Sequence, residues 1–243
     1  MTTDVLTSPL YGSRTAARAL EPMQHTAARL AGFLYLLTNA TAIFAFAIRG
    51  RLIVRGDVVR TAKNIAASER LFRAGIVAEL VTIAAVIMLI VALYVVLKPV
   101  SRNVALLAAF WRLAENFILV VVVLSEFAVL RLLGGGDTLQ AVDTRELQAL
   151  AYTFLRVYGD GFRIGFMFLG LGSAAFAYLW LKSRYIPRWL AALGLVASLL
   201  MAVVEMSVMV FPDLASVVGM AYMAPMGLFE IGGGLWLLIK GIR

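Results

Sequence analysis

The chain has 243 residues, of which 62% are hydrophobic, and its formal net charge at pH 7 is +8. A mean hydropathy of +0.91 excludes a water-soluble fold of this length, because too much apolar surface would stay exposed. The positive residues are scattered among predicted helix ends, which argues against nucleic acid as a partner. The composition therefore predicts an integral membrane protein whose first partner is the lipid bilayer.

Six apolar stretches are each long enough to cross a bilayer as a helix, which takes about 20 residues. None of them alternates in hydropathy as the strands of a membrane barrel would. We therefore predict an all-α fold, a polytopic integral membrane helical bundle with six transmembrane helices. The predicted spans cover residues 29–48, 72–97, 104–133, 158–181, 189–211 and 217–239.

The first residues of the chain differ from the rest in composition. Residues 1–28 are polar and lack helical periodicity, so we expect a disordered tail ahead of a single transmembrane domain at 29–243. A cleavable signal peptide is not expected, because this polar lead-in is unusually long.

The first connector contains an amphipathic segment. Asp57 is a good N-cap, and Val58, Ala62 and Ile65 follow at helical spacing. The other side of the segment is polar and consists of Arg60, Lys63 and Asn64. We predict one interfacial amphipathic helix here, which is either a solvated connector at headgroup depth or a functional element, a contact for anionic lipid or a lid.

Basic residues in the connectors bear on orientation. Those that fall on the side of the termini are Arg14, Arg18, Arg29, Lys98, Arg102, Lys182, Arg184, Arg188, Lys240 and Arg243. By the positive-inside tendency we expect both termini in the cytoplasm. The basic first connector, which would then lie outside, argues the other way.

Several separated motifs carry a resemblance to a known family. They are LIVRGD, NIAASERLFR, LKPVSRNVALLAAFWRL, YLWLKSRYIPRWLAALG and GLWLLIKG. Together they resemble the bacterial multi-pass membrane family of unknown function DUF4386, over nearly the whole chain from Arg29. The resemblance implies a bacterial cytoplasmic (inner) membrane protein, and it implies an acidic residue at Glu230 and an arginine at Arg112. Where that family often has proline, this chain has Arg55.

The residue types limit the available chemistry. The chain has no cysteine, and its one histidine, His25, lies in the polar N-terminal segment. Thiolate, iron–sulfur and multi-histidine sites are therefore excluded, and no cofactor or metal is expected. Carboxylates, guanidiniums, hydroxyls and amides remain.

Charged residues inside the spans fall into two layers when depth is taken as about 1.5 Å per residue. Arg112, Glu115 and Glu230 approach the bilayer midplane, and we predict that they converge on the inward faces of the third and sixth spans. An outer layer nearer the headgroups consists of Glu79, Asp160, Arg163 and Glu205.

The midplane residues admit two interpretations. A lone charge there costs about 2.5 to 3.5 kcal/mol on insertion scales, so partners are required. Arg112 and Glu115 share a helix face, and if Glu230 joins them one carboxyl should hold a proton at neutral pH. The cluster is either a structural clasp or the lining of a site for a proton or small ligand.

The outer layer is expected to be paired at the rim of the membrane. We predict that Arg163 pairs with Glu79 or Glu205, because the three share a depth. Glu126 and Arg131, near the end of the third span, are expected to be interfacial.

Two backbone features lie near these charges. Pro225 falls inside the predicted last span, where a missing amide should kink the helix about one turn from Glu230. Gly161 and Gly165 form a small-xxx-small pattern that favours close packing of a neighbouring helix.

Three function classes follow from the sequence. We rank binding or proton-linked transport of a small ligand first, a membrane sensor or assembly partner second, and a carboxylate-based membrane enzyme third. No motif of a known hydrolase or diphosphate-binding enzyme is present. Six spans without an internal repeat favour transport only if the protein forms a homodimer.

Overall fold

A computed structural model describes residues 22–134 and 142–242. Within these residues all regular structure is helical, and six helices are long and apolar enough to cross a membrane, as predicted. The helices are α1 (Pro22–Leu52), α2 (Val58–Ala67), α3 (Glu69–Leu97), α4 (Arg102–Gly134), α5 (Thr144–Ser183), α6 (Arg188–Val210), α7 (Leu214–Val218), the 3₁₀ turn η2 (Ala221–Met223) and α8 (Ala224–Ile239).

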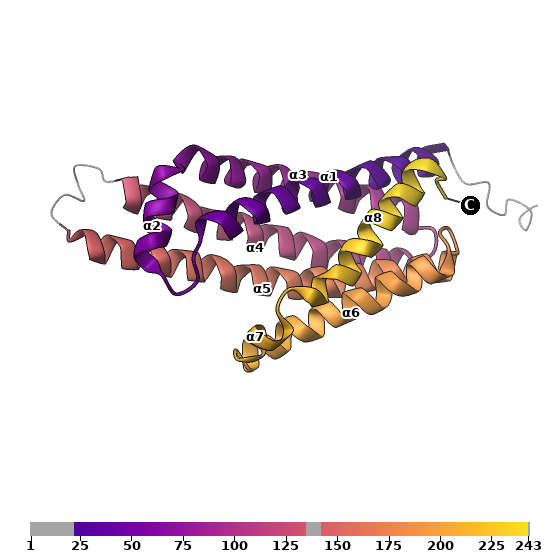
Figure 1. The fold of residues 1–243 in the computed structure, drawn as a ribbon. Coiled ribbons are helices and arrows are strands. Elements are labelled where there is room, and N and C mark those ends of the chain that lie inside the picture. The colour runs from indigo at the N-terminus through magenta and orange to yellow at the C-terminus, as the bar shows by residue number, and fades with distance from the viewer. Residues whose placement is uncertain (1–21, 135–141, 243) are drawn as a thin grey trace, which may run out of the picture.

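Four long helices, α1, α3, α4 and α5, run side by side along the length of the molecule (Figure 1). The helix α6 packs against α5, and α8 packs against both α1 and α6. The start of α1 and the end of α8 lie at the same end of the bundle, while α2 crosses the opposite end (Figure 1). An even number of spans requires this arrangement of the ends.

The outer surfaces of the spans are apolar. Phe44, Val77 and Phe117 are each half or more exposed, although their side chains are large and hydrophobic. Surfaces of this kind are stable only against lipid tails, because in water they would drive aggregation. The exposed apolar surface therefore agrees with the hydropathy of the sequence.

The first helix is longer than predicted at both ends. It begins at Pro22, so residues 22–28, which we assigned to the tail, are helical. The rest of the predicted tail lies outside the described residues. The helix continues through Arg49 to Leu52 instead of stopping at Ile48, and this extension carries Arg49 into the bundle, where it is buried.

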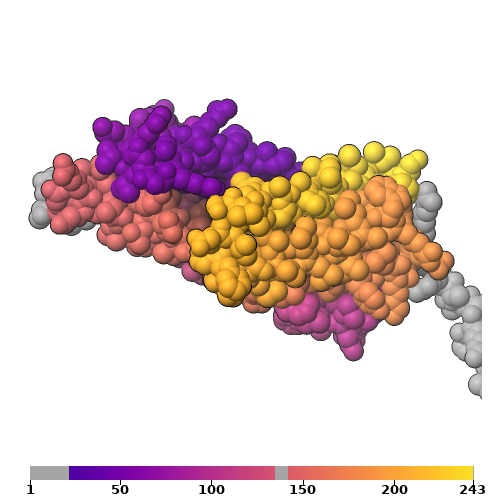
Figure 2. All heavy atoms as spheres, turned by 60° about the horizontal axis from the view of Figure 1, so that its bottom comes forward, coloured from indigo at the N-terminus to yellow at the C-terminus, as the bar shows by residue number. Residues whose placement is uncertain are grey.

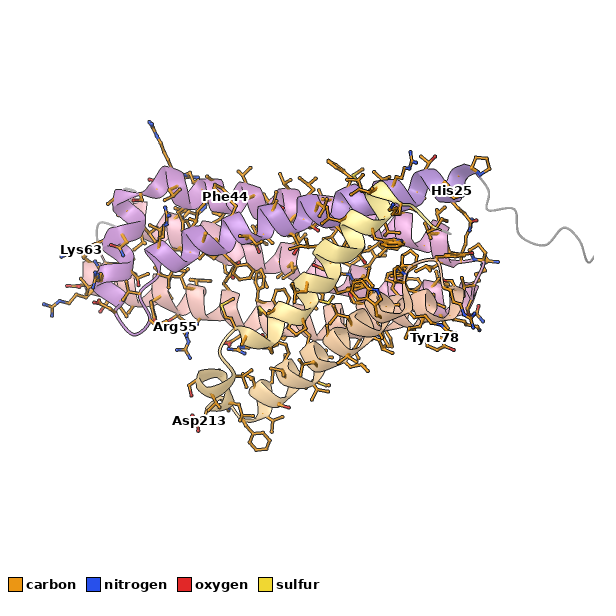
Figure 3. The ribbon with its side chains drawn as sticks, turned by 45° about the vertical axis from the view of Figure 1, so that its right-hand side comes forward. His25, Phe44, Arg55, Lys63, Tyr178 and Asp213 are labelled. Atoms are coloured by element: carbon orange, nitrogen blue, oxygen red, sulfur yellow. The ribbon has the colours of Figure 1, made fainter. Side chains whose placement is uncertain are left out.

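The amphipathic connector forms the helix α2, as predicted. The Asp57 side chain accepts a hydrogen bond from the amide of Arg60 at 2.9 Å and so caps its first turn. Ala62 and Ile65, on the apolar side of α2, are buried. Lys63 is exposed and lies at this end of the molecule in Figure 3.

The predicted last span is not one helix. It is divided into α7, η2 and α8, and Gly219 between them adopts a positive φ of +57°. Pro225 lies in the first turn of α8, where an amide has no helical partner in any case, so the expected kink within the span does not occur.

Candidate functional site

One charged cluster joins four helices, α1, α3, α4 and α5. Arg49 of α1 is only 7% exposed, and its Nε and Nη2 donate to the two carboxylate oxygens of Glu126 on α4, each at 2.8 Å. Nη2 also donates to Oε2 of Glu79 on α3. Tyr158 of α5 donates to the same oxygen at 2.9 Å, and its ring centroid lies 4.6 Å from the Arg49 Cζ. We call these four residues the Arg49 cluster.

The Arg49 cluster corrects the assignment of Glu126. We expected this residue at the interface, but it is 1% exposed and both of its oxygens are bonded to Arg49. The reason is that α1 runs one turn farther than predicted and brings a guanidinium to its depth. Arg131, by contrast, is exposed in the last turn of α4.

A second cluster lies on α4, α1 and α8. Arg112 Nη1 and Glu115 Oε2 are 2.7 Å apart, and the two residues are 4% and 2% exposed. Their geometry is not that of a hydrogen bond, so neither atom has a hydrogen-bond partner. The Asn116 amide donates to the Arg112 carbonyl at 2.9 Å, but its own oxygen is also without a partner.

Glu230 completes the second cluster from α8. Its Oε2 accepts a hydrogen bond at 2.9 Å from the side-chain amide of Asn39 on α1. Among the described residues, no cation lies within ion-pair distance of Glu230, so Arg112 is not its direct partner. We call Arg112, Glu115, Asn116, Asn39 and Glu230 the Arg112 cluster.

Both clusters open onto one cavity of about 240 Å³. Its charged lining residues are Arg49, Glu79, Arg112, Glu115 and Glu230. Three aromatic residues, Phe46, Phe162 and Phe166, also line it. The three midplane residues singled out from the sequence therefore converge on one space, with their polar atoms in a mostly apolar surrounding.

The cavity exists because α1 and α8 meet at one end and separate toward the other. At Gly32, an added Cβ would lie 2.7 Å from the carbonyl oxygen of Gly234, so the two backbones touch there. Toward the start of α8 the helices diverge (Figure 1). In the space-filling view the C-terminal helices cover only the half of the face nearer the termini (Figure 2).

The small-residue pattern on α5 acts as predicted. Gly161 faces the side chain of Val122, and a Cβ at Gly165 would lie 3.1 Å from Leu119, both on α4. The same face continues to Gly172, where a Cβ would lie 2.7 Å from Arg112 Cγ. Close packing of α5 therefore holds the stem of Arg112 in position.

The predicted outer layer is divided by the structure. Arg163 pairs with Glu205 at 3.5 Å, as predicted, and Tyr222 of η2 also donates to Glu205. Glu79 belongs instead to the Arg49 cluster. Asp160 is exposed and has no hydrogen bond or ion pair within the described residues. None of Asp160, Arg163 and Glu205 lines the cavity.

Sequence reasoning missed Arg49, Asn39 and Tyr158 as site residues. Arg49 was placed in a connector because the hydropathy of the first span falls at Ile48. The signal that could have found it is its helical phase, since Thr38, Ala45, Arg49 and Leu52 share one buried face of α1. His25, the one histidine, lies at the end of the bundle with the termini (Figure 3).

Comparison with protein-family models identifies the family. The model described as "Domain of unknown function (DUF4386)" matches residues 30–241. The chain belongs to the DUF4386 family. Comparison of this DUF4386 protein with curated proteins and with solved structures found no significant match. The evidence for its function therefore comes from the cavity.

Proposed function

We propose that this protein binds a small ligand in the cavity and moves it across the membrane in exchange for a proton. The observation that carries the proposal is a set of buried polar atoms without hydrogen-bond partners around a space large enough for a molecule. They are Glu79 Oε1 and Asn116 Oδ1, to which the Arg112–Glu115 ion pair adds Nη1 and Oε2, which are 2.7 Å apart but not aligned as a hydrogen bond. Unpaired buried polar groups are costly and rare, and a ligand that pairs with them removes the cost.

A purely structural clasp is less consistent with the Arg112 cluster. A clasp stabilises a bundle when its donors and acceptors are satisfied by one another. Arg112 and Glu115 touch without hydrogen-bond alignment, and Glu230 has only a neutral amide as its partner. This arrangement supports a binding site whose polar groups pair with a bound ligand.

The carboxyl groups support the proton-exchange part of the proposal. The two clusters contain four carboxyl groups, Glu79, Glu115, Glu126 and Glu230, and two guanidiniums, so carboxyls are in excess by two. A carboxylate without a counter-charge in a dry space is costly, and a bound proton or a bound ligand can each neutralise it. Exchange between the two would couple ligand movement to proton movement.

The test uses the full chain in vesicles that contain a pH-sensitive dye. We expect proton movement when a set of small amines, acids and neutral solutes is added outside, and we expect Glu230→Gln to abolish it. Asp160→Asn is the matched control, because Asp160 is also a carboxyl in a span but does not line the cavity. Absence of both proton movement and any ligand-induced shift in melting temperature would refute the proposal.

We also propose that the protein lies in a bacterial inner membrane with both termini cytoplasmic. The basic connectors on the side of the termini support this orientation. Since the chain has no cysteine, single cysteines introduced at residues 98–102 or 212–214 can be labelled without background. We expect a membrane-impermeant reagent, added to intact cells, to label the second connector and not the first.

A further inference from the structure

We infer that the cavity is built for a small organic cation, an ammonium group attached to one apolar ring or a short chain. The inference rests on the proposed function and names the class of ligand for the same cavity. Three features of the cavity support it: the charge of its polar lining residues, the phenyl rings among its lining residues, and its volume.

The polar wall offers acceptors in excess of donors. Arg49 is already bonded to both oxygens of Glu126 and to one oxygen of Glu79. The other oxygen of Glu79 lies buried without a partner, in a residue that is 4% exposed. An incoming anion would find one guanidinium already bonded to carboxylates, whereas an incoming cation would find an unused carboxylate oxygen.

The other half of the cavity repeats this imbalance. The single cation of the Arg112 cluster already contacts Glu115 at 2.7 Å. Glu230 therefore remains without a cationic partner, since Asn39 supplies only a neutral N–H. Among the described residues, Glu230 thus has no cation within ion-pair distance, and Glu79, although paired with Arg49, has one unused carboxylate oxygen; an ammonium group could pair with either.

Three phenyl rings line the same cavity as these carboxyls. The rings of Phe46 and Phe162 meet edge to face with centroids 5.8 Å apart, and those of Phe162 and Phe166 with centroids 5.2 Å apart. The faces of aromatic rings carry the negative part of the ring quadrupole and attract cations, so phenyl rings in the lining favour a cationic ligand over an anionic one. Phenyl rings also cover the apolar part of a ligand without competing for the ammonium group.

The volume selects an organic cation over a bare ion. A cavity of about 150 Å³ is known to hold one benzene ring, and this cavity of about 240 Å³ leaves additional room for a short charged arm. Within the described residues, no group of three histidine, cysteine or acidic side chains is positioned to hold a metal ion. The space therefore fits one ring and one ammonium group.

Three probes of matched shape and different charge test the inference. They are benzyltrimethylammonium, its neutral isostere neopentylbenzene and the anion phenylmethanesulfonate. Binding to the full chain in lipid nanodiscs is measured by calorimetry, with empty nanodiscs as the blank for partitioning into lipid. We expect the cation to bind at least about tenfold more tightly than either other probe.

Variants test which carboxyls are responsible. Glu230→Gln can keep the hydrogen bond from Asn39, so it should remain folded, and we expect it to weaken the cation about tenfold without changing the neutral probe. Glu79→Gln should act in the same direction. Asp160→Asn is the control and should bind the cation as the original protein does.

The outcomes separate this inference from the proposed function. Equal binding of the cation and its neutral isostere, or tighter binding of the anion, would overturn the inference and leave ligand binding itself intact. Proton movement in vesicles without cation binding would do the same. Absence of binding by every probe together with absence of proton movement would refute both.

Discussion

The Arg49 cluster and the Arg112 cluster contain the same kinds of group, yet their bonding differs. Arg49 makes aligned hydrogen bonds to two carboxylates, and both oxygens of Glu126 are used. Arg112 touches one carboxylate without alignment and leaves buried atoms unbonded. The comparison teaches that two clusters of equal charge and burial can differ in hydrogen bonding: one buried atom, Glu79 Oε1, has no hydrogen-bond partner in the Arg49 cluster, and three have none in the Arg112 cluster.

The largest expected effect is the loss of the Arg49 guanidinium, which is bonded to two carboxylates. Arg49→Met leaves Glu79 and Glu126 buried without their counter-charge, and we expect the free energy of unfolding to fall by about 3–5 kcal/mol. Reversible unfolding in mixed micelles measures it. The control is Arg70→Met, because Arg70 is exposed on α3. Equal losses in the two variants would show that the Arg49 cluster does not stabilise the bundle.

The next effect concerns what holds Arg112. In Gly172→Ala the new Cβ would lie 2.7 Å from Arg112 Cγ and 3.0 Å from the Ala108 carbonyl oxygen. We expect a loss of about 1–3 kcal/mol in unfolding free energy and weaker ligand binding, because α5 and Arg112 must both shift. Gly159→Ala on the same helix meets nothing within 4 Å and should not reduce stability. A harmless Gly172→Ala would mean that Arg112 is not held by packing.

A smaller effect tests whether the outer pair belongs to the site. Tyr222→Phe removes the hydrogen bond to Glu205, and we expect a loss of about 0.5–1.5 kcal/mol in unfolding free energy with unchanged ligand binding. Tyr178→Phe, at an exposed position, controls for the change of residue. If Tyr222→Phe weakens ligand binding more than stability, the connector between α6 and α8 contributes to the site.

The smallest effect on stability should come from the most drastic substitution. The triple variant Arg112→Met, Glu115→Leu, Glu230→Leu replaces the charges of the Arg112 cluster by apolar groups, which is often neutral or stabilising for buried ion pairs. We expect the melting temperature in detergent to be unchanged or raised and ligand binding to be lost. Arg112→Met alone should destabilise, because it leaves Glu115 unpaired. A triple variant that unfolds would show that the charges of the Arg112 cluster are needed to stabilise the bundle, as we expect for those of the Arg49 cluster.

Much of the fold could be predicted because it follows from local sequence signals. Span length, the capped amphipathic helix after Asp57 and the close packing of α5 at Gly161 and Gly165 all follow from local sequence. The pairing of Arg163 with Glu205 also followed, since equal depth in a bilayer leaves few alternative partners. These features depend on neighbours along the helix or on depth.

Features that depend on where a helix ends could not be predicted in the same way. The hydropathy of α1 falls at Ile48, but the helix continues because Arg49 finds two carboxylates across the bundle. The last span was counted from residue 217, whereas α8 begins at Ala224 after a break at Gly219. The first error arises because partners on distant helices hold Arg49, and the second because hydropathy does not record the positive φ of Gly219 or the place of Pro225 in the first turn of α8.

The contact between α1 and α8 also has a consequence for the time at which the cavity forms. Asn39 and Glu230 are 191 residues apart in the chain. At a synthesis rate of about 5–20 residues per second, α1 has been made for about 10–40 s before its partner leaves the ribosome. During this interval Gly32 and Asn39 of α1 lie in the membrane without the α8 residues that they contact in the folded protein. The cavity is therefore among the last parts of the molecule to form, and a chain that stops before α8 has membrane helices but no site.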